Sequence, residues 1–136
     1  MIAITPQMRV LVAIEPADFR CGIDGLSQRC RSVLNHNPFA GTVIVFRNRA
    51  GKAIKLLVYD GQGFWLCYKR MSASRFRFWP SSPGAAAKTL LAHELQVLIF
   101  GGDPLQAQAA PVWRPVSPTQ VDEARPPPLT FHDLVR

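Results

Sequence analysis

The sequence has few of the residue patterns that exported, membrane-bound or disulfide-linked proteins carry. Cys21, Cys30 and Cys67 are an odd number of cysteines without a CxxC pair, which favours reduced thiols over a disulfide framework. No apolar run approaches the roughly 20 residues that a membrane-spanning helix needs. The N-terminus also lacks the cationic and apolar segments of an export signal. We therefore expect a soluble, cytoplasmic protein without a membrane partner.

Patterns typical of catalytic and metal sites are missing as well. His93-Glu94 would resemble the start of a zinc-protease motif only if a second histidine stood at position 97, which is Val. Neither GxGxxG nor the GxxxxGK[ST] phosphate loop occurs. The first eighty residues hold four acids, too few to converge on two catalytic metal ions once turn and capping roles are assigned: Glu15, Asp18, Asp24 and Asp60. The sequence predicts a protein that is not an enzyme and holds no cofactor or metal.

What the sequence has in excess is positive charge, and that charge is unevenly distributed. Lys and Arg number 16 against 9 Asp and Glu, a formal net charge of +7. Residues 1–80 hold 12 of the cations and 4 of the acids, giving +8, whereas residues 81–136 hold 4 and 5, giving −1. Concentrated positive charge attracts polyanions, of which nucleic acid is the commonest, although it can also serve solubility alone.

Length and hydrophobic patterning predict one α+β domain over residues 1–102, with two helices on a mostly antiparallel sheet of about five strands. Strands are expected over 9–14, 42–47, 53–59, 64–69 and 75–79, and helices over 22–35 and 85–99. The turn Asp60-Gly61-Gln62-Gly63 predicts that the third and fourth strands pair antiparallel. Residues 103–136 hold seven of the 12 prolines and no apolar periodicity, so we expect a disordered tail or a ligand-like extension.

The pairing of this hairpin locates a candidate nucleic-acid surface. If Tyr59 pairs with Phe64, and Lys69 with Arg75, one sheet face brings together Trp65, Lys69, Arg75, Arg77 and Trp79. Aromatic rings beside cations can stack on exposed bases and neutralise phosphates. The opposite face, closed by Phe76 and Phe78, would then be the core. A shift of one residue in the 70–74 loop would scatter the cluster, so that alternative stays open.

Several segments resemble a known family of mobile-element proteins. They are Arg9-Val-Leu-Val-Ala13, Pro16-Ala-Asp-Phe-Arg-Cys-Gly-Ile-Asp-Gly-Leu26, Asn37-Pro-Phe-Ala-Gly41, Phe46-Arg-Asn-Arg49, Ile54-Lys-Leu-Leu-Val-Tyr-Asp-Gly-Gln-Gly-Phe-Trp-Leu66, Lys69-Arg-Met71 and Arg75-Phe-Arg-Phe-Trp-Pro80. Together they resemble the TnpB-type, or Orf2, accessory proteins of the bacterial IS66 insertion sequences. Met71 stands where that family often has Leu, and Ser74 where Gly is common. The resemblance implies a protein that assists transposition beside a separate transposase, which carries the strand-transfer chemistry.

Two functional interpretations remain open at this point. In the first, the protein is a DNA-binding accessory factor, and its candidate contacts are Arg47, Arg49, Lys52, Lys55, Trp65, Lys69, Arg70, Arg75, Arg77 and Trp79. In the second, it is an adaptor that docks on the transposase through the aromatic sheet face or the proline-rich tail, without intrinsic DNA affinity. DNA and the transposase are the expected partners, and the aromatic residues leave self-association open.

Overall fold

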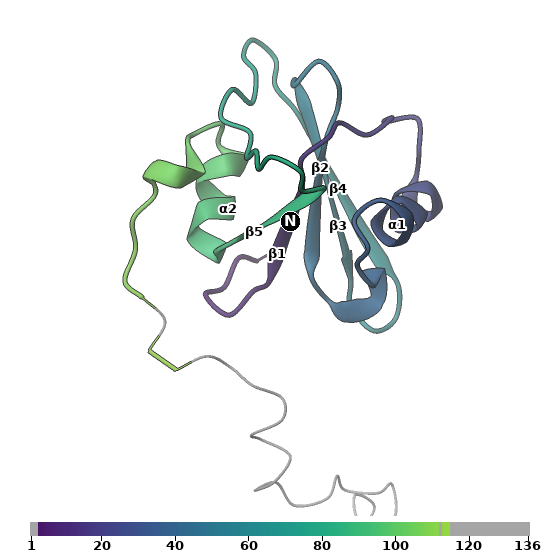
Figure 1. The fold of residues 1–136 in the computed structure, drawn as a ribbon, viewed down its shortest axis with the longest axis horizontal. Helices are drawn as coiled ribbons and strands as arrows, with labels where there is room; N and C mark the ends of the chain where they lie inside the picture. Colours follow the sequence, from purple (N-terminus) through teal and green to yellow (C-terminus); the bar gives the residue numbers. More distant parts are fainter. Residues whose placement is uncertain (1–2, 112, 115–136) are drawn as a thin grey trace, which may run out of the picture.

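The computed structural model describes residues 3–111, 113 and 114, which form a five-stranded sheet between two helices (Figure 1). The elements are β1 (Val10–Ala13), α1 (Ile23–Ser32), η1 (Pro38–Ala40), β2 (Val43–Arg47), β3 (Ala53–Tyr59), β4 (Phe64–Arg70), β5 (Ala87–Leu90), α2 (Ala92–Ile99) and η2 (Pro104–Gln106). The strand order is β4-β3-β2-β1-β5, and only the β1–β2 pair is parallel. The expected α+β class with two helices on a mostly antiparallel sheet is confirmed.

The sheet is buried on both faces, because one helix covers each face (Figure 1). Successive strand residues point to opposite faces, so Val43 and Val45 of β2 face α2, whereas Ile44 and Phe46 face α1. On the α2 side they pack with Leu95 and Leu98, among others. This double coverage explains why β2 is apolar at consecutive positions rather than at every second one. The expectation of a single core face is therefore wrong.

The hairpin register is confirmed, but the predicted fifth strand is not. Tyr59 pairs with Phe64 and Lys55 with Tyr68, as the turn sequence indicates. Residues 75–79 form no strand; they cross the edge of the α2-side core, where Phe76 is buried. The segment is held by single contacts, such as the hydrogen bond from Phe76 N to Gly51 O, rather than by a ladder.

The fifth strand instead lies within the residues predicted as the second helix. Ala87–Leu90 pairs antiparallel with β1, and α2 begins only at Ala92. Residues 85–87 are alanines, which favour a helix locally, but hydrogen bonding to the otherwise open edge of β1 outweighs that preference. The Glu94 carboxylate accepts a hydrogen bond of 2.7 Å from the backbone N–H of Leu91 and so stabilises the start of α2.

The C-terminal segment is described only in part. Pro104–Gln106, inside the predicted tail, forms the short helix η2, in which Pro104 is buried. The Asp103 carboxylate accepts a hydrogen bond of 3.0 Å from the Leu105 N–H and begins this turn. Residues 112 and 115–136 of that tail lie outside the described residues. In the described part of the chain, no helix has the length and apolarity needed to cross a membrane.

Candidate nucleic-acid interface

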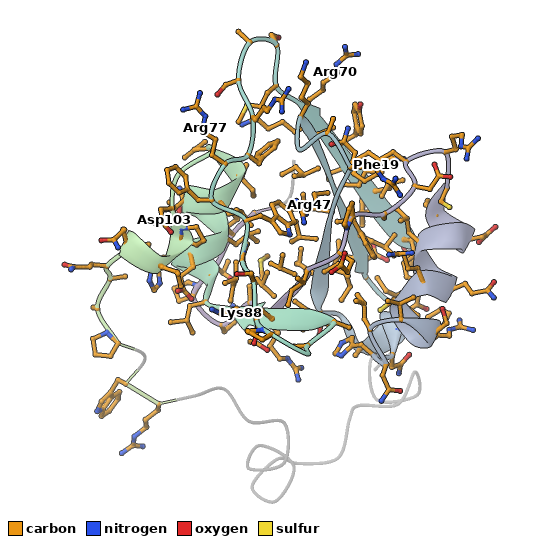
Figure 2. The ribbon with its side chains drawn as sticks, turned by 45° about the horizontal axis from the view of Figure 1, so that its top comes forward. Phe19, Arg47, Arg70, Arg77, Lys88 and Asp103 are labelled. Atoms are coloured by element: carbon orange, nitrogen blue, oxygen red, sulfur yellow. The ribbon has the colours of Figure 1, made fainter. Side chains whose placement is uncertain are left out.

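Exposed cations gather at one end of the sheet, where the β2–β3 turn meets the chain that follows β4. We call this surface the basic end and define it by five exposed residues: Arg49, Lys52, Arg70, Arg75 and Arg77. All five belong to the set predicted from the sequence. Figure 2 shows Arg70 and Arg77 at this end and Lys88 away from them, on the edge strand β5.

Backbone hydrogen bonds bring these segments together. Arg70 is the last residue of β4 and pairs with Ala53, directly after the β2–β3 turn. The Met71 N–H then donates to the Lys52 carbonyl, and the Phe76 N–H donates to the Gly51 carbonyl, each at 2.8 Å. Gly51 has φ +71°, a conformation that favours glycine and completes the tight turn. The cations therefore lie on two adjoining loops that the sheet fixes in place.

The charges of the basic end are available to a ligand. Within residues 3–111, 113 and 114, none of the five cations forms an ion pair, and the ion pair present joins Arg20 to Asp18. Phe78, which the sequence placed in the core, is 47% exposed beside Arg77 in the chain. The basic end thus offers guanidinium and ammonium groups next to one open aromatic ring.

Arg47 and Trp79, in contrast, hold the structure together. The Arg47 guanidinium donates through Nε and Nη2 to the Ile14 carbonyl, at 3.2 and 3.0 Å, and lies 5.7 Å from the Trp79 ring centroid. The Trp79 indole N–H donates to the Ala13 carbonyl at 2.8 Å. These two side chains tie β2 and the 71–80 segment to the end of β1. Trp79 is therefore packed rather than presented for base stacking.

Lys55 is also a structural cation. Its side chain is only 9% exposed, and Nζ donates to the carbonyls of Phe19 and Cys21 at 3.0 and 3.1 Å. The ammonium also lies 4.9 Å from the Phe19 ring centroid and 5.8 Å from that of Tyr68. These contacts fasten the loop before α1 to β3, so Lys55 has little surface left for DNA.

Lys69 and Trp65 do not join the cluster that the sequence predicted. Lys69 Nζ donates to the Ile99 carbonyl at the end of α2, at 2.7 Å, and lies 5.7 Å from the Phe100 ring centroid. Trp65 is 60% exposed but sits at the turn end of β4, where its indole N–H donates to Asp60. Because 75–79 is not a strand, the pairing of Lys69 with Arg75 that was predicted to assemble the cluster does not form.

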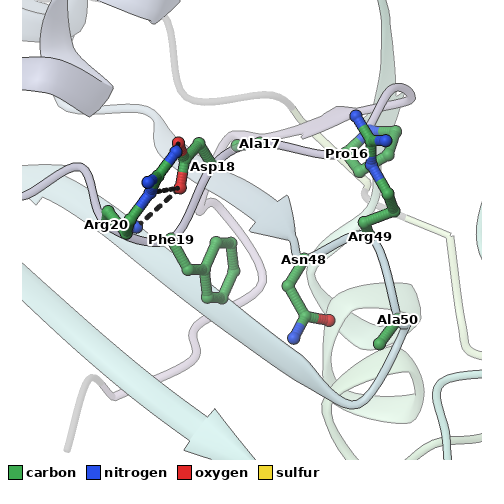
Figure 3. Close-up of a pocket in the computed structure, with 8 residues that line it drawn as sticks. All are labelled: Pro16, Ala17, Asp18, Phe19, Arg20, Asn48, Arg49 and Ala50. Carbon is green, nitrogen blue, oxygen red and sulfur yellow. Dashed lines mark hydrogen bonds and ion pairs between the residues drawn. The ribbon is translucent and has the colours of Figure 1, made fainter.

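A depression next to the basic end adds a cation that the sequence reasoning missed. It has a volume of about 420 Å³ and is lined by Pro16, Ala17, Asp18, Phe19, Arg20, Asn48, Arg49 and Ala50 (Figure 3). Arg20 Nη2 and Asp18 Oδ2 are 2.8 Å apart, and hydrogen bonds from Arg20 lower the pKa of Asp18 to about 2. Figure 3 shows this pair on one side of the depression and Arg49 on the other. In the sequence, the segment Asp18-Phe19-Arg20 could have indicated this cation. The neighbouring acid offsets the charge of Arg20, so the segment does not stand out as basic.

The described residues hold no group of three or more His, Cys, Asp or Glu side chains that could bind a metal ion. The buried Cys30 thiol donates to the His36 carbonyl at 3.3 Å, and burial raises its pKa. A thiol with a raised pKa is a poor nucleophile at neutral pH. Cys30 therefore serves packing in the α1-side core.

Comparison with known proteins places this arrangement in a family. The family model described as IS66 Orf2 like protein matches residues 8–109, which include the whole sheet and the basic end. The chain belongs to the IS66 Orf2-like family. An accessory role in insertion-sequence transposition follows from this membership. No solved structure matches the chain.

Two relatives from Sinorhizobium fredii support the assignment to the IS66 Orf2-like family. The chain is 40% identical over 108 residues to uncharacterized protein y4hO, which covers 79% of this chain and 90% of the relative. It is 32% identical over 115 residues to uncharacterized protein y4jC, covering 85% of this chain and 97% of the relative. The similarity thus spans nearly the full length of both relatives.

Proposed function

We propose that this protein is a non-catalytic accessory factor of insertion-sequence transposition that binds DNA through the basic end. The observation that carries the proposal is the gathering of five exposed, unpaired cations on two adjoining loops of the described structure. Membership of the IS66 Orf2-like family supports the proposal, because insertion-sequence transposition takes place on DNA.

The basic end suits phosphates better than base edges. Arg49, Arg70, Arg75 and Arg77 offer planar forks that can bind phosphate oxygens bidentately, and Lys52 adds a point charge. All five lie in loops or at a strand end. They are therefore not carried on an exposed helix or a two-stranded ribbon that could enter the major groove and contact base edges. Phe78 can stack on a base that is unpaired or distorted. We infer binding that depends on the backbone and shape of DNA more than on its sequence.

Counter-ion release makes this proposal quantitative. Neutralising five phosphates of duplex DNA predicts a slope of log K against log salt of roughly −4.5. Replacing two of the cations by alanine is expected to reduce the magnitude of this slope by about 2.

The test is a titration of fluorescent double- and single-stranded DNA at several salt concentrations. Arg75→Ala/Arg77→Ala removes two charges from the basic end. As the control, Arg9→Ala/Lys88→Ala removes two charges from outside it: Arg9 precedes β1 at the other end of the sheet, and Lys88 lies on the edge strand β5. We expect the first variant to bind at least tenfold more weakly, with the shallower slope, and the control to stay close to the wild type. No binding even at low salt, or equal losses in both variants, would overturn the proposal.

A second candidate function is that of an adaptor on the cognate transposase without intrinsic DNA affinity. A cleft of about 570 Å³ between β4 and α2 favours it, because its lining is largely apolar and includes Ile54, Leu56, Cys67, Leu95 and Ile99. Calorimetric titration with the purified transposase, in the absence of DNA, separates the two. A stable complex together with no DNA binding would favour the adaptor.

A further inference from the structure

Within the described part of the chain, the strand β4 leaves one edge of the sheet open. It has seven residues and pairs there with β3 alone, whereas the strand at the other edge, β5, has four residues. It contains no proline, and its only charged residues are Lys69 and Arg70 at its end. Open edges of this length are usually protected by charge, proline or a covering element, because they pair readily with another chain.

The hydrogen-bond pattern identifies the free groups on β4. The Asp60 N–H donates to the Gly63 carbonyl, and the Met71 N–H donates to the Lys52 carbonyl. In an antiparallel ladder the bonded pairs alternate, so Trp65, Cys67 and Lys69 exchange hydrogen bonds with β3. The N–H and C=O groups of Phe64, Leu66, Tyr68 and Arg70 therefore point away from the sheet.

We propose that a second copy of this chain docks on β4, so that two β4 strands pair antiparallel about a twofold axis at Cys67. This register is the one in which all seven residues of both strands overlap. It sets Trp65 against Lys69 of the second copy and Phe64 against Arg70 of the second copy. Each strand then contributes an aromatic end that meets a cationic end.

The two ends of β4 are complementary in charge, and this complementarity favours a second copy of the chain as the partner on the open edge. The Asp60 carboxylate accepts the Trp65 indole N–H at 2.7 Å, so an anion and an aromatic face lie together at one end of β4. Hydrogen bonds from the Gln62 N–H, the Trp65 indole and the Gly63 N–H lower the pKa of Asp60, which keeps it ionised. The opposite end carries Lys69 and Arg70, and antiparallel pairing places each end beside its complement.

The pairing would also cover exposed aromatic surface. Trp65 is 60% exposed and Tyr68 is 56% exposed, on opposite faces of the strand. Edge pairing with four such rings gives an interface at the small end of the specific range, so we expect micromolar dimerisation. Six residue steps of about 3.3 Å would separate the two basic ends by about 20 Å along the paired strands. Such a dimer would present two basic ends to DNA. The dimer itself is proposed independently of DNA binding.

The first test measures mass against concentration by analytical ultracentrifugation, from about 1 to 200 µM. Cys67 then reports the register, because two cysteines opposite each other at a non-hydrogen-bonded site can form a disulfide. Oxidation with copper phenanthroline in air removes two electrons and two protons from this thiol pair. We expect a Cys67–Cys67 crosslink by mass spectrometry, and a Cys67→Ser variant that dimerises without it. A monomer throughout the range would overturn the proposal.

Two pairs of matched variants test which edge is used. Leu66→Pro removes an N–H that faces the second copy, and Thr89→Pro removes an outward N–H from the edge strand β5. Only the first is expected to abolish the dimer. At the exposed Trp65, which can be changed without disturbing the core, Trp65→Lys should weaken dimerisation at least tenfold, whereas Trp65→Glu should retain more of it. Equal behaviour within either pair would overturn the proposed pairing.

Discussion

Replacing Lys55 by methionine tests the distinction between cations that hold the fold together and cations that we propose bind DNA. The change keeps most of the side-chain volume but removes the ammonium group. The carbonyls of Phe19 and Cys21 then lose donors at 3.0 and 3.1 Å, and the Phe19 ring loses a cation 4.9 Å from its centroid. We expect the loop before α1 to loosen from β3 and the domain to lose stability.

Hydrogen bonds to charged groups contribute about 1.5–3 kcal/mol each, and desolvation of the ammonium offsets part of that gain. For the two bonds together we expect a loss of about 2–4 kcal/mol. With a urea dependence of about 2 kcal/mol per molar, the middle of the range for a small domain, the unfolding midpoint should fall by about 1–2 M. The assay is urea unfolding followed by tryptophan fluorescence at neutral pH.

Lys52→Met is the matched control, because Lys52 is exposed at the basic end and the change in charge is identical. This control should unfold within about 0.5 kcal/mol of the wild type, yet bind DNA more weakly. Lys55→Met should show the reverse: lower stability, with DNA affinity of the folded protein unchanged. A stable Lys55→Met variant that binds DNA more weakly would refute the assignment.

Two further predictions concern other contacts near this end of the sheet. Trp79→Phe removes the indole donor to the Ala13 carbonyl and should cost about 1–2 kcal/mol of unfolding free energy in the same urea assay, without changing the salt slope of DNA binding. The pKa of Asp18 is lowered in the folded state to about 2, so the stabilisation from its contact with Arg20 is present above about pH 4 and is lost as the pH falls towards 2. Carboxyl-carbon NMR should show its midpoint near pH 2 in the wild type and at a higher pH, part of the way towards 3.8, in Arg20→Ala, which keeps the backbone N–H donor of residue 20. An unchanged midpoint would contradict the contact between the side chains.

The sequence predicts most of the sheet because its strongest signals are local. The turn at residues 60–63 sets the pairing of Tyr59 with Phe64, and the structure confirms that register. The β-branched and aromatic run over residues 42–47 likewise locates β2, and three- and four-residue helical spacing locates α1. In each case, neighbouring residues along the chain carry the information that decides the structure.

The errors arise where contacts distant in sequence decide. Ala87–Leu90 has helix-favouring neighbours, and only the open edge of β1, more than seventy residues earlier, makes it a strand. The aromatic residues at 76, 78 and 79 are typical of a strand, yet Phe76 fills a gap in the core and Trp79 donates to Ala13. No periodicity within 70–80 distinguishes a paired strand from an extended segment that packs through single side chains.

Contacts distant in sequence also decide which cations of the predicted site are left free for a ligand. Arg47, Lys55 and Lys69 each donate to backbone carbonyls of a segment distant in sequence: Ile14 after β1, the 19–21 loop, and Ile99 at the end of α2. A long cationic side chain can satisfy carbonyls that end a strand or helix, and this use leaves its charge partly neutralised by local dipoles. The excess of positive charge in residues 1–80 therefore overstates the charge available to DNA. What favours DNA binding is the placement of five further cations on two loops where no carbonyl or carboxylate engages their side chains within the described chain.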